Sequence, residues 1–498
     1  MRILKNSAYL NFKQDGLAYI FILIFTFSTQ FSTHHQETLG WDVNTFIVMS
    51  QEILRGNLPY ENYFDNKGPV LYFLYSIPTY FQSLILIKIF NDLILFSVSV
   101  QMFFISKKVL NNEKLMFSLL PSLFFLSYMS HPQGHLGMSE VYSLLFLNLS
   151  LKQLFKNKKI NYFLAGCYLG LSFLVTPSSI LFVLVILLIT IFKIYSLGSY
   201  FLTKQIILGT LFPIIFVFIL YGLKKNLLKV IYTLFVFPIE YSSLFLLKNK
   251  LIEIFNHLTQ YIYIKEFKIL GYISIFLLFF FVIIFISNIF MIKNLELSNE
   301  EQYFKILILS LLLTSLFSYL FTPAGHWHYL IYYFGFLSFI PLLIKRTKVV
   351  IFIFFMLIVS FLNISTTTMK ASLDNLSNIS SIHEKHEILQ DYKYLKKNYD
   401  IETIIALDNH LILFYFNKGG ENYILHPSNY QKESYLNSLI NKGYLADNEV
   451  SILIQEGRAD LLICSESFIE TCSSNINSYI EINVNSEKLY LINNRLEK

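Results

Sequence analysis

Long hydrophobic stretches separated by short polar turns fill the chain as far as about residue 370, where a polar segment begins. The runs 16–31, 116–128, 180–194 and 271–292 approach or exceed the roughly 20 residues that cross a bilayer as a helix. Mean hydropathy is +0.52, and 54% of the 498 residues are hydrophobic. This pattern predicts an α-helical polytopic membrane protein.

About eleven stretches are apolar enough to be transmembrane helices. They are roughly 17–33, 89–106, 115–130, 139–155, 161–176, 178–195, 204–222, 269–292, 304–322, 327–343 and 348–365. The stretch 70–87 is ambiguous, because Pro78, Thr79 and Gln82 interrupt it. Whether it crosses the membrane decides on which side every later loop lies.

The distribution of lysines decides between these two topologies, since positive residues are enriched in cytoplasmic loops. If 70–87 does not cross, the Lys-rich turns near 107–114, 152–159, 193–204 and 345–348 all lie inside. We therefore expect 70–87 to be an outer-surface or re-entrant helix. The N-terminus is then cytoplasmic and the C-terminal segment extracytoplasmic. A second outer segment, 223–268, is expected to lie as an interfacial helix.

Charge and turn signals change near residue 370. Residues 366–498 hold 12 Lys and Arg against 18 Asp and Glu, a net charge of −6 within a chain of +6. We expect a transmembrane domain over 1–369 and a soluble extracytoplasmic α/β domain over 370–498. The basic excess of the first part belongs to inner loops and indicates no nucleic-acid partner. A Cys464–Cys472 bridge requires that the second domain be extracytoplasmic.

A dense polar passage, read as a loop, lies between the first hydrophobic stretch and the next, over residues 40–71. It includes Asp42, Arg55, Asp65 and Lys67, although only 14% of the chain is charged. Asp42 follows the interfacial anchor Trp41 and could deprotonate an acceptor or hold a divalent cation. A solvated loop acid is the simpler alternative. The passage is an active-site candidate at the outer membrane surface.

Lys67 stands two residues before Pro69, a residue suited to the first helical turn. A Lys beside an electropositive helix start suits a phosphate group, whereas a snorkelling interfacial Lys explains it equally well. Asp65 lies two residues before Lys67 and is therefore a candidate for contacting the substrate. These residues, with Arg55, are candidates for binding a phosphorylated donor.

Two further outer turns carry candidate residues. Glu140 opens the fourth span after the polar turn 131–139, as a catalytic acid or as a dipole-stabilised helix acid with Ser139 as a cap. His326, His328 and Tyr329 join the ninth and tenth spans and could bind phosphate or orient substrate. Their spacing gives only a weak metal signal, because no acid or Cys is adjacent.

The sequence lacks the signals of two classes of membrane protein. No GxxxxGK[ST] loop is present, so an ATP-driven pump is not indicated. Charges within the spans are few, which argues against an ion-coupled transporter. Polar residues gather at the outer helix ends, as in an enzyme that acts at the outer leaflet.

The passage Gly56-Asn57-Leu58-Pro59-Tyr60-Glu61-Asn62 through Lys67-Gly68-Pro69 resembles a first-loop motif of the GT-C membrane glycosyltransferases. The likeness is to the family 39-like bacterial branch related to protein O-mannosyltransferases and the lipid A aminoarabinose transferase. The motif reads G-x-x-P-Y-x-D-x-x-x-x-K-x-P, and Asn62 stands where it has Asp. The overall plan of about a dozen spans and an outer domain is also similar.

This resemblance implies an enzyme that takes sugar from a polyprenyl-phosphate donor on the outer face. Asp42 matches the first-loop catalytic acid, although Val43 stands where relatives often have a second acid. Lys67 matches a lysine before Pro-Pro, and Glu140 falls where relatives carry another acid. His328-Tyr329 matches a His-Tyr pair in a late outer loop, whereas Thr176-Pro177 replaces a Lys-Pro pair.

The function expected from the sequence is an inverting glycosyltransferase of the bacterial plasma membrane that acts in cell-envelope polysaccharide biosynthesis. Its partners would be a polyprenyl-phosphate-linked sugar, a lipid, glycan or protein acceptor, and membrane lipids. The sequence requires no cofactor, and a divalent cation (Mg²⁺ or Mn²⁺), with Asp42 as its ligand, is compatible with it. The alternatives are a cell-surface polysaccharide polymerase or ligase, and a non-catalytic flippase or transporter of lipid-linked sugar.

Overall fold

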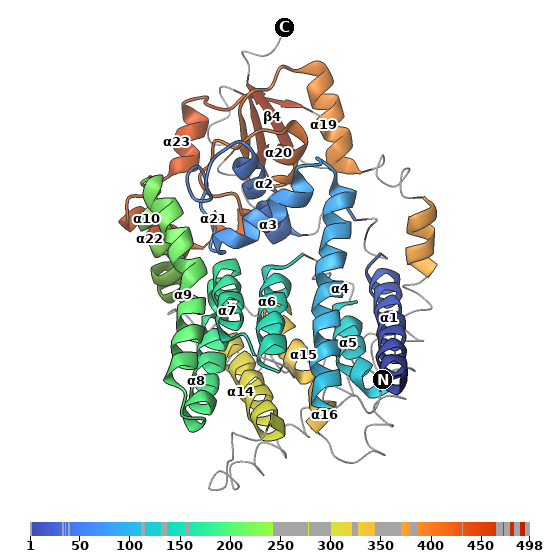
Figure 1. The fold of residues 1–498 in the computed structure, drawn as a ribbon. Helices are drawn as coiled ribbons and strands as arrows, with labels where there is room; N and C mark the ends of the chain where they lie inside the picture. The colour runs from blue at the N-terminus through green and yellow to red at the C-terminus, as the bar shows by residue number, and fades with distance from the viewer. Residues whose placement is uncertain are drawn as a thin grey trace. The chain divides into compact units, whose positions relative to one another are not determined.

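The structure is a computed structural model of the whole chain, shown in Figure 1. It describes residues 2–493 with internal gaps. The gaps are 32–33, 35, 38–39, 111–114, 131–136, 156–159, 243–276, 278–299, 321–326, 344–369, 379–385, 431, 465–471, 473–478 and 483–488.

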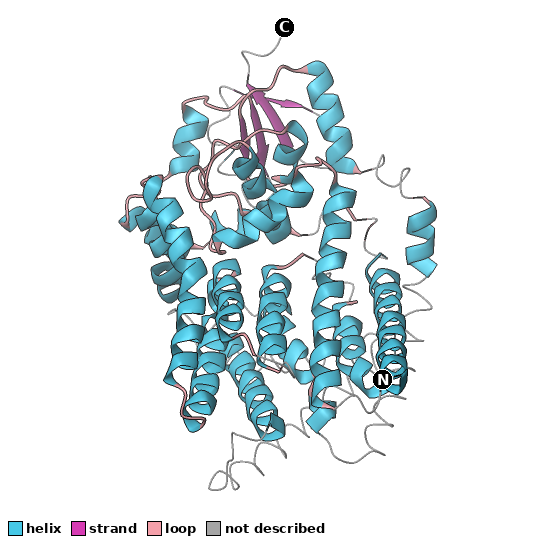
Figure 2. Ribbon diagram, viewed as in Figure 1, coloured by secondary structure: helices cyan, strands magenta, loops and turns pink. Residues whose placement is uncertain are grey.

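Helices make up most of the described chain, and strands occur only after residue 400 (Figure 2). Four described helices are long and apolar enough to cross a membrane, which makes this a helical membrane protein. They are α4 (Leu84–Val109), α8 (Ile180–Ser196, preceded by the 3₁₀ turn η2, Pro177–Ser179), α9 (Tyr200–Leu223) and α14 (Glu300–Leu320).

Shorter apolar helices accompany these four. They are α1 (Arg2–Gln30, apolar from Asp15), α5 (Leu115–Met129), α7 (Tyr162–Val175), α15 (Ile331–Leu337) and α16 (Ile340–Leu343). Between α5 and α7 lies the helix α6 (Ser139–Leu154). The span expected at 348–365 falls outside the described residues, and so does the span at 269–292 except for Leu277.

The ambiguous stretch 70–87 does not form one helix. Its first part is α3 (Pro69–Thr79), whose 11 residues extend about 16 Å, too short to cross a membrane. Pro78 lies within the last turn of α3, and Gln82 just after it has a φ of 51°. The chain then enters α4 at Leu84, five residues earlier than the expected start at 89. No single helix therefore runs through 70–87, and its expected place as an outer-surface or re-entrant helix stays a prediction.

The chain divides into two compact units, each built from several separate segments. Unit 1 comprises Met1–Thr33, Asn91–Val217 and Leu244–Leu376, and unit 2 comprises His34–Phe90, Phe218–Ser243 and Ser377–Lys498. The domain boundary expected between residues 369 and 370 lies seven residues before the last division between the units, which falls between Leu376 and Ser377. The polar passage 40–71 therefore belongs to the same unit as the C-terminal segment.

Unit 1 contains a helix contact without intervening side chains. A Cβ added at Gly166 of α7 would lie 2.2 Å from the Ile206 carbonyl oxygen of α9, and one at Gly209 would lie 2.1 Å from the Phe163 carbonyl oxygen. Gly170, four residues after Gly166, approaches α9 in the same way. Such small-residue spacing lets two membrane helices come together along their backbones.

Unit 2 holds a four-stranded sheet of order β1-β2-β4-β3. The strands are β1 (Ile404–Ala406), β2 (Leu461–Cys464), β3 (Tyr479–Ile482) and β4 (Leu489–Asn493). β1 pairs in parallel with β2, and the other two pairs are antiparallel. The helices of this part are α19 (Glu387–Asn398), α20 (Leu411–Phe416), α21 (Pro427–Tyr430), α22 (Glu433–Asn441) and α23 (Glu449–Gln455).

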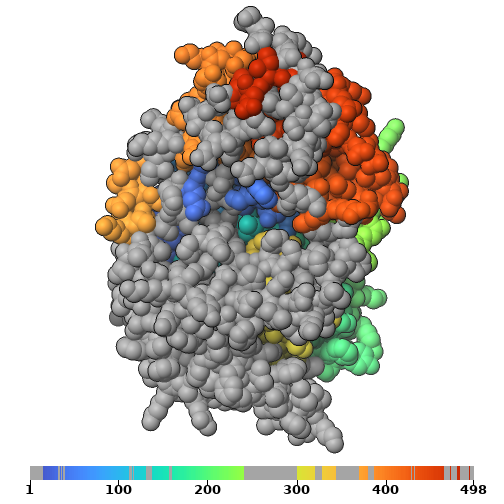
Figure 3. All heavy atoms as spheres, turned by 180° about the vertical axis from the view of Figure 1, so that it is seen from behind, coloured from blue at the N-terminus to red at the C-terminus, as the bar shows by residue number. Residues whose placement is uncertain are grey.

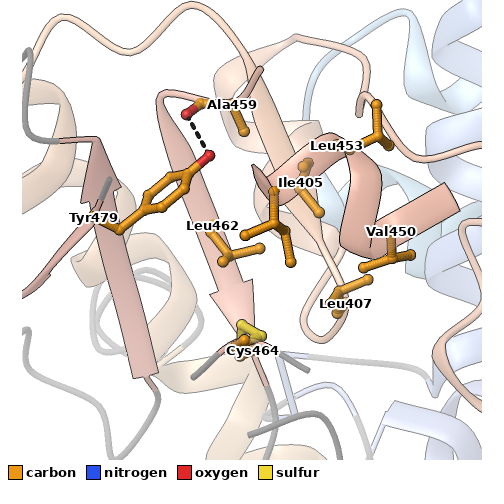
Figure 4. Close-up of a cluster of buried hydrophobic side chains, with 10 residues drawn as sticks. Ile405, Leu407, Val450, Leu453, Ala459, Leu462, Cys464 and Tyr479 are labelled. Atoms are coloured by element: carbon orange, nitrogen blue, oxygen red, sulfur yellow. Dashed lines mark hydrogen bonds between the residues drawn. A yellow bond between two sulfur atoms is a disulfide. The ribbon is translucent and has the colours of Figure 1, made fainter. Parts of the chain in front are cut away.

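The two parallel strands are apolar at every position, because both of their faces are buried. Ile405, Leu462 and Leu453 pack together in one cluster, to which Tyr479 adds a hydroxyl that donates to the Ala459 carbonyl (Figure 4). Cys464 at the end of β2 forms a disulfide with Cys472. The bridge that the sequence left open is therefore present in the structure.

The segment expected as the interfacial helix 223–268 is, in its described part, one continuous helix that contains a π-helical turn. It consists of α10 (Leu227–Ile231), a π-helical turn η3 (Tyr232–Val236) and α11 (Phe237–Ser242). Leu228 and Ile239 are 76% and 70% exposed, as expected for an interfacial element. On another side, Phe237 contacts the rings of Phe64 and Tyr435.

Candidate active site

The polar passage is not the loop that the sequence suggested, because its first part is the helix α2 (Trp41–Leu54). Its concentration of charged residues made the passage resemble a loop, yet Asn44, Gln51 and Glu52 of α2 are all buried. The Gln51 amide donates to the Phe414 carbonyl, and Glu52 accepts from Asn57 and Asn62, so these two polar side chains can be buried at low cost. Gly40 precedes α2 with a φ of 95°, a conformation that glycine adopts readily.

Asp42 lies in the first turn of α2, where the helix dipole stabilises a carboxylate. Its side chain is 27% exposed, so it can meet both solvent and a substrate. The Nε2 atom of His426 lies 3.5 Å from its Oδ1 atom, close enough for an ion pair when the imidazole is protonated. The Trp41 ring meets the ring of His426 edge to face at 6.0 Å.

A second histidine of the C-terminal segment holds the same turn of α2. The Nε2 atom of His410 lies 3.0 Å from the Thr45 hydroxyl and 3.1 Å from the Trp41 carbonyl oxygen. Complete burial lowers the pKa of His410 to about 3, and the nearby His426 adds to this effect. His410 is therefore a neutral hydrogen-bonding residue at physiological pH.

Asp65 is a buried carboxylate in the connection between α2 and α3. The Tyr72 hydroxyl donates to its Oδ2 atom at 2.6 Å, and the Asn66 backbone N–H donates to Oδ1 at 2.8 Å. Burial raises the pKa of Asp65, while the Tyr72 hydrogen bond and the charges of Lys67 and His426 oppose that rise. Asp65 is thus electrostatically coupled to a lysine and a histidine.

Lys67 stands just before α3, which begins with Pro69 at its first position as the sequence suggested. Only 6% of Lys67 is exposed. The Tyr60 hydroxyl donates to the Lys67 carbonyl, and Tyr60 itself has a φ of 69°, a strained value for a residue other than glycine. The Tyr60 hydroxyl therefore helps to hold the backbone that carries Lys67.

Arg55 pairs with Glu52 rather than standing alone. Glu52 is buried, and its carboxylate also accepts from Asn57 at 2.8 Å and from Asn62 at 2.7 Å. Asn62, the position at which the chain departs from the GT-C motif, is thus a donor to Glu52. The Arg55 guanidinium has an anionic partner close by, which would compete with a phosphate group.

The connection after α2 is fastened to the C-terminal segment by backbone contacts. Phe64 and Ile424 form a parallel bridge, in which the Phe64 N–H donates to the Tyr423 carbonyl at 2.8 Å. The Tyr63 hydroxyl donates to the Gly420 carbonyl at 3.0 Å. Because Asp65 and His426 follow the bridged residues, the bridge brings them near each other. In Figure 3, blue atoms of the α2–α3 region are visible beside orange and red atoms of the C-terminal segment.

Glu140 belongs to unit 1 and is completely buried in the first turn of α6. The Ser139 hydroxyl donates to its Oε2 atom at 3.0 Å. The expected role of Ser139 as a cap is wrong, because Met138 is the N-cap and makes no side-chain bond. On the next turn, the Tyr142 hydroxyl donates to Asn91 of α4 at 2.5 Å.

The late outer turn is described only from residue 327. His328 is 8% exposed in the 3₁₀ turn η5 (Trp327–Leu330), and its ring lies 4.3 Å from that of Tyr329. His326 lies outside the described residues. The described part of unit 1 also buries Asp92 in α4, an acid within a span that the sequence survey passed over.

The described residues contain no group of three His, Cys, Asp or Glu side chains arranged to hold a metal ion. Asp42 has one histidine, His426, beside it. The divalent cation expected at Asp42 stays a prediction.

Sequence reasoning missed both His410 and His426, and took His426-Pro427 only as a turn signal. They lie more than 360 residues from α2 along the chain, so no local spacing connects them to Asp42. The available signal was weak: two histidines followed by short helices within one acidic segment.

A scan against protein-family models finds no match to this chain, and searches of curated proteins and of solved structures find none either.

Proposed function

We propose that this protein is an inverting glycosyltransferase that moves a sugar from a polyprenyl-phosphate donor to a cell-envelope acceptor. In this proposal about eleven transmembrane helices and outer interfacial helices form a GT-C-like domain over 1–369. Residues 370–498 form the extracytoplasmic α/β domain. The four long apolar helices and the motif at 56–69 support it.

The observation that carries the proposal is the grouping of Asp42, Asp65, Lys67 and His426 in unit 2. Three of them come from the polar passage and the fourth from a segment more than 350 residues later. Such a concentration of coupled acids and bases is typical of a reaction centre. Asp42 is the most exposed acid of the group, so it is best placed to meet an acceptor.

In the proposed reaction, the carboxylate of Asp42 removes the proton of the acceptor's hydroxyl or amine group. That atom then attacks the anomeric carbon, and the bond from this carbon to the lipid phosphate oxygen breaks. Attack and departure occur on opposite sides of the carbon, so its configuration inverts. A general base of this kind contributes about 10²–10⁴-fold to the rate.

The departing phosphate gains negative charge, which a nearby cation stabilises. Lys67 is the residue we assign to this role, since its ammonium group precedes the electropositive start of α3. Arg55, His328 and Tyr329 remain further candidates for the phosphate, Asp65 and His326 for the sugar, and Glu140 for a second catalytic acid.

Two features support an extracytoplasmic location for the C-terminal segment. Disulfides persist in oxidising compartments, and Cys464 is bridged to Cys472. The lysines 107, 108 and 193 lie in the last turns of α4 and α8, which the positive-inside rule assigns to the cytoplasmic side. The proposed setting is the bacterial plasma membrane, with the N-terminus inside.

One observation favours the transporter alternative. Asp92 is completely buried in α4, and acids within membrane spans often line ion or substrate paths. An enzyme and a transporter differ in what they do to the donor, because only the enzyme breaks the bond between sugar and phosphate.

The test is mass spectrometry of a polyprenyl-phosphate-sugar pool incubated with the purified protein, wild type beside Asp42→Asn. We expect wild type alone to convert the donor, together with acceptor from a membrane extract, into free lipid phosphate and a glycosylated product. Equal conversion by both proteins would remove Asp42 from the mechanism. Donor binding without conversion by either would favour a transporter.

A further inference from the structure

The rigid segment before α21 carries His426 to the first turn of α2. Ile424 and Leu425 are completely buried, and the Asn422 side chain donates to the Ile424 carbonyl at 2.6 Å. Pro427 begins α21 directly after the histidine, and the His426 carbonyl accepts from the Asn429 N–H at 3.0 Å. The backbone around His426 therefore has little freedom.

The same segment is tied to the proposed reaction centre by the Phe64–Ile424 bridge. His426 consequently has Asp42 3.5 Å away on α2 and is electrostatically coupled to Asp65 in the α2–α3 connection. His410, held by α2 and standing just before α20, is close enough to His426 to interact with it electrostatically. The His426 side chain is only 12% exposed, so its ring is held among these groups.

We propose that His426 is a positioning residue for Asp42, and that the C-terminal segment thereby completes the reaction centre. The Nε2–H group would donate to Oδ1 of Asp42 and leave Oδ2 directed toward the acceptor. The distance of 3.5 Å is long for a hydrogen bond, and such contacts commonly shorten when substrate binds. This inference rests on the proposed glycosyl transfer.

An oriented carboxylate accelerates the reaction without changing how tightly the donor is held. Loss of the N–H donor should therefore lower kcat and leave the KM for donor nearly unchanged. If the His426 ring served only to pack against Trp41, any aromatic residue could replace it without loss of kcat.

Two variants separate these roles. His426→Phe keeps an aromatic ring beside Trp41 and removes the N–H group, whereas His426→Gln keeps an N–H donor and removes the ring. We expect His426→Phe to lower kcat by about 10- to 100-fold at a donor KM within about threefold of wild type. His426→Gln should retain kcat within about threefold of wild type.

The assay uses the full chain in detergent, the polyprenyl-phosphate-sugar pool and the membrane-extract acceptor, with the thermal midpoint of each variant measured alongside. A His426→Phe variant with the kcat of wild type, or one that is more active than His426→Gln, would overturn the positioning role while wild-type activity upholds the glycosyltransferase. An inactive wild type would overturn both.

Discussion

Two contacts, one in each unit, join separate segments of the chain in different ways. In unit 1, α7 and α9 meet through glycines, and backbone lies against backbone. In unit 2, polar side chains join α2 to the C-terminal segment: Thr45 to His410, and Gln51 to the Phe414 carbonyl at 3.1 Å. Lipid offers no hydrophobic drive for helix association, so close packing serves unit 1. The polar contacts of α2 lie on the helix that carries Asp42, for which charged chemistry is proposed.

The two units also differ in how they place the acid at the start of a helix. α2 and α6 each have an acid in the first turn, yet Asp42 is partly exposed beside a histidine, whereas Glu140 is buried beside a serine hydroxyl. A partly exposed carboxylate can exchange a proton with a substrate. A fully buried one is better suited to stabilising the start of its helix.

The largest effect on stability is expected at the glycine contact of unit 1. A Cβ at Gly166 would overlap the Ile206 carbonyl, and neither helix can move without losing other contacts. Gly166→Ala should lower the free energy of unfolding by about 3 kcal/mol or more, as for a severely overpacked core. The measurement is the yield and thermal midpoint of the purified protein.

Gly222→Ala is the matched control, since nothing lies within 4 Å of a Cβ at that position of α9. It should leave the midpoint unchanged or raise it, because Ala favours a helix over Gly by about 1 kcal/mol. Equal midpoints for Gly166→Ala and wild type would show that α7 and α9 are not in backbone contact.

A smaller loss is expected in the polar network of unit 2. Glu52→Gln replaces one acceptor oxygen by an amide that faces the amide donors of Asn57 and Asn62. We expect the free energy of unfolding to fall by about 2 kcal/mol. Denaturant titration of Glu52→Gln, with the exposed Glu421→Gln as control, measures it; similar curves for both variants would argue against the network.

The pH dependence of stability should reveal that His410 is buried in its neutral form. Its pKa is about 3 when folded and about 6.5 when unfolded, so the unfolded state binds an extra proton between these values. Its effect is absent above pH 6.5, and below that value stability falls by up to about 1.4 kcal/mol per pH unit toward pH 3. Thermal midpoints of wild type and His410→Gln at several pH values test this. Parallel curves would contradict a buried neutral His410.

The sequence was a good guide wherever hydropathy alone decides the structure. The bounds of α5, α6, α7 and α8 fall within two residues of the expected spans, and 70–87 does not cross as one helix. These helices are located correctly because each is a continuous, mostly apolar run bounded by polar turns.

The sequence was a poor guide where contacts with residues far along the chain determine the structure. α2 was expected to be part of a loop, because charged residues are concentrated in this passage, and the buried partners of Gln51 and Glu52 could not be known from the sequence. Asp42, Asp65 and Lys67 were found because they are charged residues in an apolar chain. His410 and His426 were missed because only the fold brings them to α2. Gly166-x-x-x-Gly170, in contrast, was readable and was overlooked.

The central claim is that the acid of α2, rather than the acid of α6, removes the acceptor's proton. Single-turnover rates of Asp42→Asn and Glu140→Gln at saturating donor compare the two directly. The account predicts a loss of about 100-fold or more for Asp42→Asn and of less than about tenfold for Glu140→Gln, with donor binding kept in both. A larger loss for Glu140→Gln, with Asp42→Asn near wild type, would contradict it.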